Sequence, residues 1–285
     1  MVALITPFQN GEIDWRTLDE LIDFQLENGI DGIVPVGTTG ESPTLSHDEH
    51  KKVIARVVKA VGGKVPVIAG AGSNSTAEAI DLAAYARKVG ADATLQVDPY
   101  YNKPTQEGFY QHFRTIAEEV DLPMVLYDIP GRCGAGMTAE TIIRLAEIEN
   151  IVAVKEATGK LDHVSEIATG CDLTIVSGDD SLTLPIASVG GKGVISVVAN
   201  IVPADVKAMT DLILEGDLVS ARQWHNKLFA LSRNLLSLAT NPIPIKAAMS
   251  ILNMAAEELR LPMTPLDESS KAKLRQTLKD YGLLN

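Results

Sequence analysis

The stretch "IVAVKEATG", residues 151–159, places an ammonium group where an apolar strand ends. Ile151 to Val154 predict a buried strand, and Lys155 follows at its carboxyl end. A strand-end lysine can simply extend its head group to water. Held away from water, a lysine favours the neutral amine, which can attack a ketone and form a Schiff base. The iminium is an electron sink that stabilises a carbanion equivalent on the neighbouring carbon.

Tyrosines that could serve this chemistry follow two other apolar runs. Tyr100 and Tyr101 stand in "DPYYNKP", and Tyr127 stands in "LYDIPGRCG". A tyrosine hydroxyl both donates and accepts a hydrogen bond, so it can relay protons to and from a reacting carbon. Tyrosines in such loops are otherwise ordinary rim or interface aromatics.

Groups that could hold carboxylates are present as well. The stretch "GTTG" offers turn amides and the hydroxyls of Thr38 and Thr39, which together could cradle a carboxylate. Arg132 offers a planar guanidinium for bidentate binding of a second carboxylate. Taken singly, Thr38 and Thr39 are explained by the chemistry of a Gly-rich turn, and Arg132 by a location in a surface loop. Their occurrence together after successive strands favours an enzyme.

The elements that position these residues alternate between strands and helices. Eight short apolar runs begin at Val2, Gly32, Val65, Ala93, Pro123, Ile151, Leu173 and Gly193. Continuous apolar strands joined by helices indicate a parallel sheet covered on both faces. We therefore expect a (β/α)₈ TIM barrel over residues 1–216, with its site at the carboxyl ends of the strands. An open doubly wound sheet is the alternative, but no G-x-G-x-x-G follows the first strand.

Helix signals lie between the strands and after them. Leu18, Leu21, Ile22 and Leu26 share one helical face. Capping boxes are expected at Ser46 to Glu49 and at Ser75 to Glu78, the second helix ending at Gly90. After Gly216 the strand signal stops. Residues 217–285 predict a C-terminal region of three helices, within 217–238, 241–259 and 267–284.

Composition narrows the possible partners. The 285 residues carry a formal charge of −12, which argues against nucleic acid or an anionic membrane as partner. No zinc-type spacing occurs among the two cysteines, and no signal-peptide pattern or membrane-length apolar run is present. A cytoplasmic location is expected. Asp179 and Asp180 are adjacent carboxylates without a third ligand, typical of a helix start, so no metal is expected.

These motifs, taken in order, resemble the dihydrodipicolinate synthase family of pyruvate-dependent class I aldolases, whose superfamily includes N-acetylneuraminate lyase. The resemblance runs the whole length of the chain and includes "VALITPF", "VGTTGES", "PYYNKPTQEG", "LYDIPGR", "VKEATG", "SGDD" and "NPIPIK". It implies condensation of pyruvate with L-aspartate 4-semialdehyde to 4-hydroxy-tetrahydrodipicolinate, in lysine and diaminopimelate biosynthesis. It also implies a homotetramer built as a dimer of dimers, and no external cofactor.

The resemblance assigns roles at matching positions. Lys155 would form the Schiff base with pyruvate, and Tyr127 would exchange protons through Thr39 with Tyr101 of a neighbouring subunit. Thr38 and Thr39 would hold the pyruvate carboxylate. Arg132 would hold the carboxylate of the semialdehyde. Two further positions would line the pocket through backbone groups, Gly178 and Ile195.

A feedback site for L-lysine is a separate hypothesis from the same resemblance. Its matching positions are Ser42, His47, His50, Asn74, Glu78 and Tyr100. A carboxylate and an amide would suit the ligand's ammonium group. Pro43 stands where inhibited enzymes of the family have a smaller residue, and Glu78 also fits a capping box.

Two residues depart from the family pattern, and three other functions are alternatives to the condensation. Asp128 replaces the more usual Asn after Tyr127, and Cys133 replaces a common Thr after Arg132; the first could alter the charge near the proton relay. The same lysine could serve a sister aldolase with another aldehyde acceptor, such as a sugar acid. A non-catalytic binding paralogue would form no adduct. The Gly-rich "VGGKGVIS" before the eighth strand could instead cradle a phosphate in a barrel isomerase.

Overall fold

The computed structural model describes all residues, 1–285, and its parallel strands form a closed ring. The labelled strands of the ring are β1 (Val2–Ala3), β4 (Ile33–Val34), β5 (Ile68–Gly70), β6 (Ala93–Val97), β7 (Met124–Asp128), β8 (Ile151–Glu156) and β9 (Thr174–Ser177). Strands β5 to β9 form one parallel sheet in chain order, and β1 pairs with β4.

Single parallel bridges close the remaining gaps in the ring. Ile33 pairs with Val67, which joins β4 to β5. Val194 pairs with Ser177, and Ser196 pairs with Val2, so residues 194–196 form the eighth strand position between β9 and β1. The expected eight-stranded parallel barrel is therefore confirmed, with an eighth strand that is present only as isolated bridges.

Some strands are shorter than the apolar runs suggested, and the second run shows why. Strand β4 ends at Val34 because Pro35 has no N–H to donate and Val36 has a φ of 48°, outside the extended region. A separate antiparallel hairpin, β2 (Phe8–Gln9) with β3 (Glu12–Ile13), follows β1.

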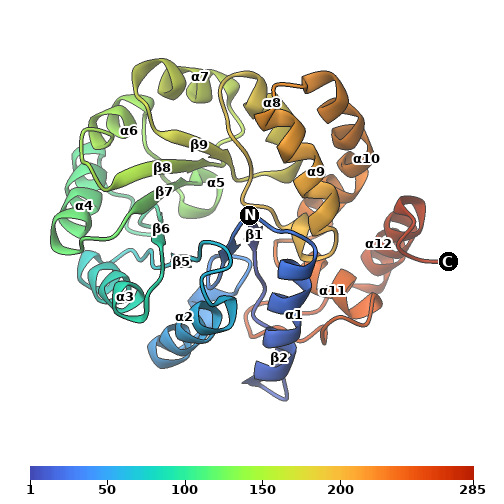
Figure 1. Ribbon diagram of the computed structural model, residues 1–285. Helices are drawn as coiled ribbons and strands as arrows, with labels where there is room; N and C mark the ends of the chain where they lie inside the picture. Colours follow the sequence, from blue (N-terminus) through green and yellow to red (C-terminus); the bar gives the residue numbers. More distant parts are fainter.

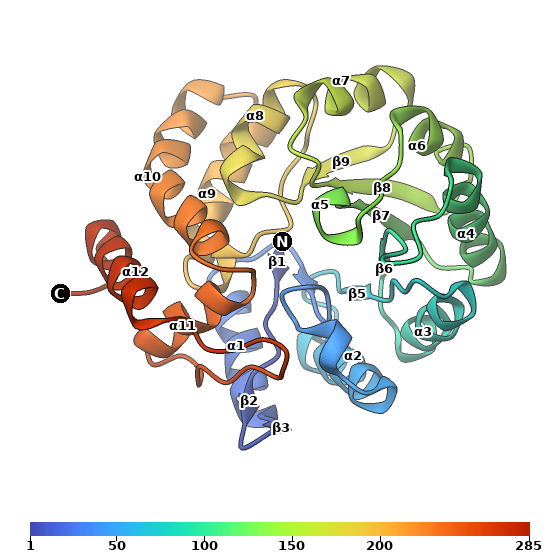
Figure 2. The ribbon, with the colours of Figure 1, turned by 180° about the vertical axis from the view of Figure 1, so that it is seen from behind.

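Helices surround the barrel on its outside, and only the short helix Pro130–Cys133 lies over the strand ends instead (Figure 1 and Figure 2). Those of the barrel are α1 (Trp15–Glu27), α2 (His47–Val61), α3 (Thr76–Val89), α4 (Gln106–Glu119), α5 (Pro130–Cys133), α6 (Ala139–Leu145), α7 (Leu161–Gly170), α8 (Thr183–Ser188) and α9 (Pro203–Leu214). Short 3₁₀ turns are η1 (Ser42–Thr44), η2 (Asp180–Leu182) and η3 (Val198–Asn200). None of the helices is both long and apolar enough to cross a membrane.

The C-terminal region contains three helices, as expected, but the middle one is shorter. They are α10 (Leu218–Ser237), α11 (Ile243–Ile251) and α12 (Glu268–Tyr281). The expectation of a helix continuing to residue 259 is wrong. Asn253 adopts a left-handed φ of 58°, which asparagine tolerates and which ends the helical run. Helix α10 packs along α9, so the barrel and the C-terminal region are in contact on both sides of residue 216. The domain boundary expected there stays a prediction.

Capping agrees at one expected helix start and differs at the other. Ser46 and Glu49 form the full capping box of α2. Ser75 precedes α3 but makes no side-chain capping bond, so the second box is wrong. The Glu78 carboxylate instead accepts a hydrogen bond from Ser73 Oγ and pairs with His47. Helix α3 does end at Gly90, in the left-handed conformation.

Two apolar cores follow from the alternation of strand side chains. The larger lies between strands and helices and includes Leu126 and Val154. The smaller fills the inside of the barrel and includes Val125, Tyr127, Ala153 and Ile195. Residues of odd number on β7 and β8 therefore point into the barrel.

Candidate active site

Lys155 and Tyr127 lie side by side inside the barrel. They are register partners on β8 and β7, so their side chains share the inner face. Lys155 is only 6% exposed, and its Nζ lies 4.0 Å from the centre of the Tyr127 ring. Tyr127 lines a cavity of the barrel, and its hydroxyl makes no hydrogen bond within the chain, so it is available to a ligand. The structure thus places the lysine in the barrel rather than in bulk water.

A second buried lysine shows what a structural lysine looks like in this chain. Lys246 on α11 is fully buried, forms an ion pair with Glu41 and donates to the Glu258 carbonyl at 2.9 Å. Burial lowers the pKa of Lys246, and Glu41 opposes that effect. Lys155 has no carboxylate partner of this kind, so its nitrogen is left without an ion pair.

A cavity of about 290 Å³ opens at the end of the barrel where the strands have their carboxyl ends. Its volume suits small metabolites. Three expected site residues line it, namely Thr38, Tyr127 and Arg132. Two other lining residues, Ser42 and Tyr100, belong to the expected feedback set. Lys155, Thr39, Gly178 and Ile195 do not line this cavity, and Lys155 adjoins it through the Tyr127 ring.

The two threonines of the "GTTG" turn face different surroundings. Thr38 lines the cavity, whereas Thr39 is buried and accepts a hydrogen bond from Asn241 Nδ2 at 3.0 Å. The N–H groups of Gly40 and Glu41 donate to carbonyls within the turn. Those of Thr38 and Thr39 donate to no backbone carbonyl, which leaves two adjacent amides to bind an anion.

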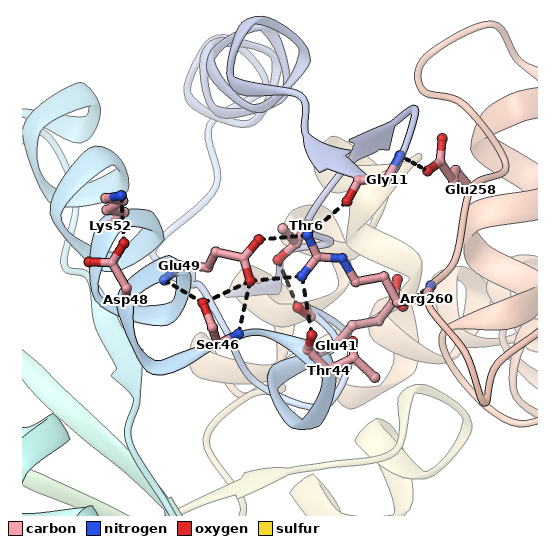
Figure 3. A network of polar contacts seen from close by, with 11 residues as sticks. Thr6, Gly11, Glu41, Thr44, Ser46, Asp48, Glu49, Lys52, Glu258 and Arg260 are labelled. Carbon is pink, nitrogen blue, oxygen red and sulfur yellow. Dashed lines mark hydrogen bonds and ion pairs between the residues drawn. The ribbon is translucent and has the colours of Figure 1, made fainter.

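The C-terminal region contacts the segment that follows this turn, through Arg260 and its neighbours (Figure 3). Glu41 is 2% exposed, pairs with Lys246 and accepts from the Arg260 N–H at 3.1 Å. Thr6 donates to the Gly40 carbonyl at 2.7 Å. These bonds fix the backbone of the turn directly after the two threonines.

Arg260 extends this network across α2 and the first hairpin (Figure 3). Its guanidinium donates to both carboxylate oxygens of Glu49, at 2.6 and 2.8 Å, and to the carbonyls of Thr44 and Gly11. The Arg260 guanidinium lowers the pKa of Glu49 to about 2, so this carboxylate stays charged at neutral pH.

Arg132 stands on α5 at the mouth of the cavity, and Figure 2 shows α5 over the ends of β7 and β8. Its side chain is exposed and donates to the Asn241 carbonyl at 3.0 Å. A guanidinium at the mouth can bind a carboxylate of a second substrate that enters after the first.

Gly178 and Ile195 approach the lysine from β9 and the eighth strand position. The Gly178 N–H donates to the Glu156 carbonyl at 2.7 Å, and the Ile195 N–H donates to the Ser177 carbonyl at 3.0 Å. Only their carbonyls therefore remain for a ligand. A Cβ at position 178 would lie 3.1 Å from Lys155 Cε and 2.7 Å from Ala157 Cβ, so a side chain there would crowd the lysine.

Tyr101 is not brought to the site within one chain. Its side chain is 89% exposed, its backbone has a φ of 74°, and it does not line the cavity. No hydrogen bond joins Tyr127 to Thr39 either. The relay through Tyr127, Thr39 and Tyr101 is thus not assembled in the single chain and stays a prediction.

The six positions expected to bind L-lysine do come together between α2, α3 and β6. His50 donates through Nε2 to the Gly70 carbonyl at 2.7 Å, so Nδ1 accepts from Ser42 at 3.4 Å. Burial lowers the pKa of His50, which favours this neutral form. On the other side, His47 pairs with Glu78.

Tyr100 and Asn74 complete the set. Asn74 Nδ2 donates to the Tyr100 carbonyl at 3.0 Å. Burial, and then the nearby Glu78, raise the pKa of Tyr100 and keep its hydroxyl neutral. The geometry brings the six residues together, and their role as a lysine site is a proposal.

A row of buried carboxylates lies on the outer face of the barrel, and it includes Asp128, the residue that departs from the usual Asn of the family. Asp98, Asp128 and Glu156 follow or end β6, β7 and β8, and all three are fully buried. Burial, and then Asp128, raise the pKa of Asp98, which favours its protonated form. His163 bonds Asp128 at 3.2 Å. Asp128 faces away from Tyr127, because neighbouring strand residues point to opposite faces.

Two other sequence features have structural explanations. Asp179 caps η2, and Asp180 accepts from the Val197 N–H at 2.9 Å, as expected for a helix start. The Gly-rich loop at 190–193 enters the eighth strand, so it lies at the amino end of the barrel, opposite Lys155. A Cβ at Gly191 would lie 2.6 Å from Ile186 Cγ2. Close packing on α8 therefore accounts for this glycine without a phosphate.

Fold and site together define the class: a (β/α)₈-barrel enzyme with its polar residues at the carboxyl ends of the strands. Residues 1–281 match the model of the Dihydrodipicolinate synthetase family, and the chain belongs to that family. The 4-hydroxy-tetrahydrodipicolinate synthase of Pelobacter propionicus is 52% identical over 286 residues, covering 100% of this chain and 98% of that protein. This similarity confirms the family expected from the sequence.

Two solved structures of the family share the fold over nearly the whole chain. One is the dihydrodipicolinate synthase of Acinetobacter baumannii complexed with pyruvate, at 42% identity and a TM-score of 0.97, covering 99% of this chain and 98% of that one. The other is the DHDPS of Cyanidioschyzon merolae with lysine bound, at 45% identity and a TM-score of 0.96, covering 99% and 97%.

Proposed function

We propose that this enzyme condenses pyruvate with L-aspartate 4-semialdehyde to give 4-hydroxy-tetrahydrodipicolinate, using a Schiff base on Lys155. One observation carries the proposal: a buried lysine without an ion pair lies 4.0 Å over the ring of Tyr127, in a chain of the dihydrodipicolinate synthetase family. The sister-aldolase alternative uses the same lysine, but the family relatives do not favour it.

The first half of the reaction activates pyruvate. The Lys155 amine adds to the keto carbon, and loss of water leaves a protonated imine. The imine withdraws electrons, so a methyl proton is released and an enamine forms. Tyr127 is the group placed to take and return protons, because its hydroxyl is unbonded and its ring adjoins Lys155. The free amides of Thr38 and Thr39 would hold the pyruvate carboxylate.

The second half joins the semialdehyde and releases the lysine. The enamine carbon attacks the aldehyde carbon, whose oxygen takes a proton and becomes the hydroxyl. The amino group of the semialdehyde then attacks the imine carbon, which closes the ring and returns Lys155 as an amine. Arg132 would hold the semialdehyde carboxylate at the cavity mouth. The carbonyls of Gly178 and Ile195 would face the bound intermediate.

We further propose that Tyr101 completes the proton relay of a neighbouring subunit in a homotetramer. Its 89% exposure and left-handed backbone hold the phenol away from its own barrel, as a contribution to another chain requires. Replacing Tyr101 with Phe should slow turnover and leave adduct formation with pyruvate largely intact. L-Lysine is the proposed inhibitor at the site of Glu78 and Tyr100. A cytoplasmic location and the absence of an external cofactor belong to the same proposal.

The acceptor assignment is tested by assaying wild type with pyruvate and a panel of aldehydes, including the semialdehyde and sugar-derived aldehydes. Arg132→Ala should raise KM for the semialdehyde roughly 10- to 100-fold, the value of a charged hydrogen-bonding group. Pyruvate trapping should change little. Arg144→Ala, which removes an exposed arginine paired with Glu107, is the matched control. An equal loss in trapping and in acceptor binding would contradict the role of Arg132.

A further inference from the structure

Asn241 joins two elements of the site from the C-terminal region. It is 7% exposed and lies two residues before α11. Its Nδ2 donates to Thr39 Oγ1 at 3.0 Å, and its backbone carbonyl accepts from the Arg132 guanidinium, also at 3.0 Å. Its Oδ1 is buried and accepts from no group of the chain. One residue therefore contacts both the proposed pyruvate cradle and the proposed acceptor group.

We propose that Asn241 is a positioning residue for the condensation: its amide sets the direction of the Thr39 hydroxyl, and its carbonyl holds Arg132 at the cavity mouth. This inference rests on the proposed function. Asn241 touches neither the cavity nor Lys155, so it acts only through the two residues that it binds.

The effect on Thr39 follows from the hydrogen-bonding capacity of a hydroxyl. A threonine hydroxyl has one proton and two lone pairs. Because the Asn241 amide donates to one lone pair, the hydroxyl proton is turned away from Asn241. That proton is then available to the substrate carboxylate or to Tyr127. A carboxylate at position 241 would accept instead and would turn the Thr39 proton away from the site.

A second contact keeps Asn241 in register with the turn. Lys246, on the first turns of α11, forms its ion pair with Glu41, which lies two residues after Thr39. Both partners are buried, and Lys246 also donates to the Glu258 carbonyl. The same two segments are thus joined at two points, so the amide cannot move independently of the threonine. The C-terminal region is in this way part of the active site.

The experiment is a double-mutant cycle between Asn241→Ala and Thr39→Val, with kcat, KM for each substrate and borohydride trapping as readouts. Asn241→Ala should lower kcat roughly 3- to 10-fold, the value of one hydrogen bond. In the Thr39→Val background the same substitution should produce no further fall in kcat. KM for the semialdehyde should stay near the wild-type value, because alanine retains the backbone carbonyl that Arg132 binds.

Effects that multiply in the double variant would overturn the proposal, since a residue that only stabilises the fold does not depend on the Thr39 hydroxyl. Asn241→Asp keeps the side-chain shape and should slow pyruvate trapping, even if Asn241→Ala does not fold. Asn253→Asp, an exposed asparagine of the same region, is the control. Wild-type trapping in Asn241→Asp would also overturn it. Absence of an adduct in wild type would instead refute the proposed function itself.

Discussion

The glycine at position 178 leaves room for Lys155, and we expect Gly178→Ala to displace the lysine. An added Cβ would lie 3.1 Å from Lys155 Cε and 2.7 Å from Ala157 Cβ. Carbon atoms in good contact are about 3.5–4.0 Å apart. The lysine must therefore move by roughly 0.4–0.9 Å to restore this separation. The shorter contact with Ala157 Cβ requires a shift of the backbone at Gly178 or Ala157 as well.

The size of the effect can be estimated from this displacement. Overpacking of this kind costs roughly 1–3 kcal/mol of folding free energy. A misplacement of about 1 Å at a reacting group can cost on the order of 10²-fold in rate. We therefore expect Gly178→Ala to slow pyruvate adduct formation roughly 10- to 100-fold. The melting temperature should fall by about 2–4 °C for each kcal/mol lost.

The assay is the rate of borohydride trapping with pyruvate, measured beside thermal unfolding. Gly193→Ala is the matched control, because a Cβ there meets nothing within 4 Å. Trapping at the wild-type rate in Gly178→Ala would show that this position does not confine the lysine. That result would refute the packing argument for the site.

Three further predictions test other parts of the structure. Glu41→Gln should lower the free energy of unfolding in urea by roughly 3–5 kcal/mol, because it leaves the buried ammonium of Lys246 without its carboxylate. The double variant Glu41→Gln with Lys246→Met should recover much of that free energy, and equal losses in the single and the double variant would contradict this reasoning. Because the pKa of Asp98 is raised, the folded state keeps a proton that the unfolded chain loses above about pH 4, so stability falls as pH rises. Asp98→Asn should therefore have a higher melting temperature than wild type at pH 8 but differ little at pH 4, and a difference independent of pH would contradict the raised pKa. Glu78→Ala should abolish inhibition by L-lysine and leave turnover without lysine near wild type, as measured by inhibition curves, and an unchanged curve would place the lysine site elsewhere.

Much of the fold followed from the sequence because barrel strands are continuous apolar runs separated by helices. The runs at Ile151 and Pro123 became β8 and β7 nearly as expected. Elsewhere, local backbone features shortened the elements: Pro35 and Val36 ended β4, and Asn253 ended α11. The capping box expected at Ser75 does not form because Glu78 bonds across to His47 on α2, a tertiary contact that no local pattern shows.

The site residues that the sequence predicts are those that stand at the end of a strand or in the turn that follows it. Lys155, Tyr127 and Thr38 are of this kind, since strand order alone places them on one rim. Asn241 was missed because it reaches Thr39 across some two hundred residues of chain, although it lies in the quoted "NPIPIK". The Asp98 and Asp128 pair was missed because strand pairing, rather than either motif, brings the two carboxylates together.

The central claim is that one lysine of this chain bonds covalently to pyruvate, and peptide mass mapping after borohydride reduction tests it most directly. The account predicts a reduced pyruvate adduct on Lys155 that is absent from Lys155→Arg. Lys246, which is fully buried and paired with Glu41, should stay unmodified. An adduct on Lys246 alone, or no adduct at any lysine, would contradict the account.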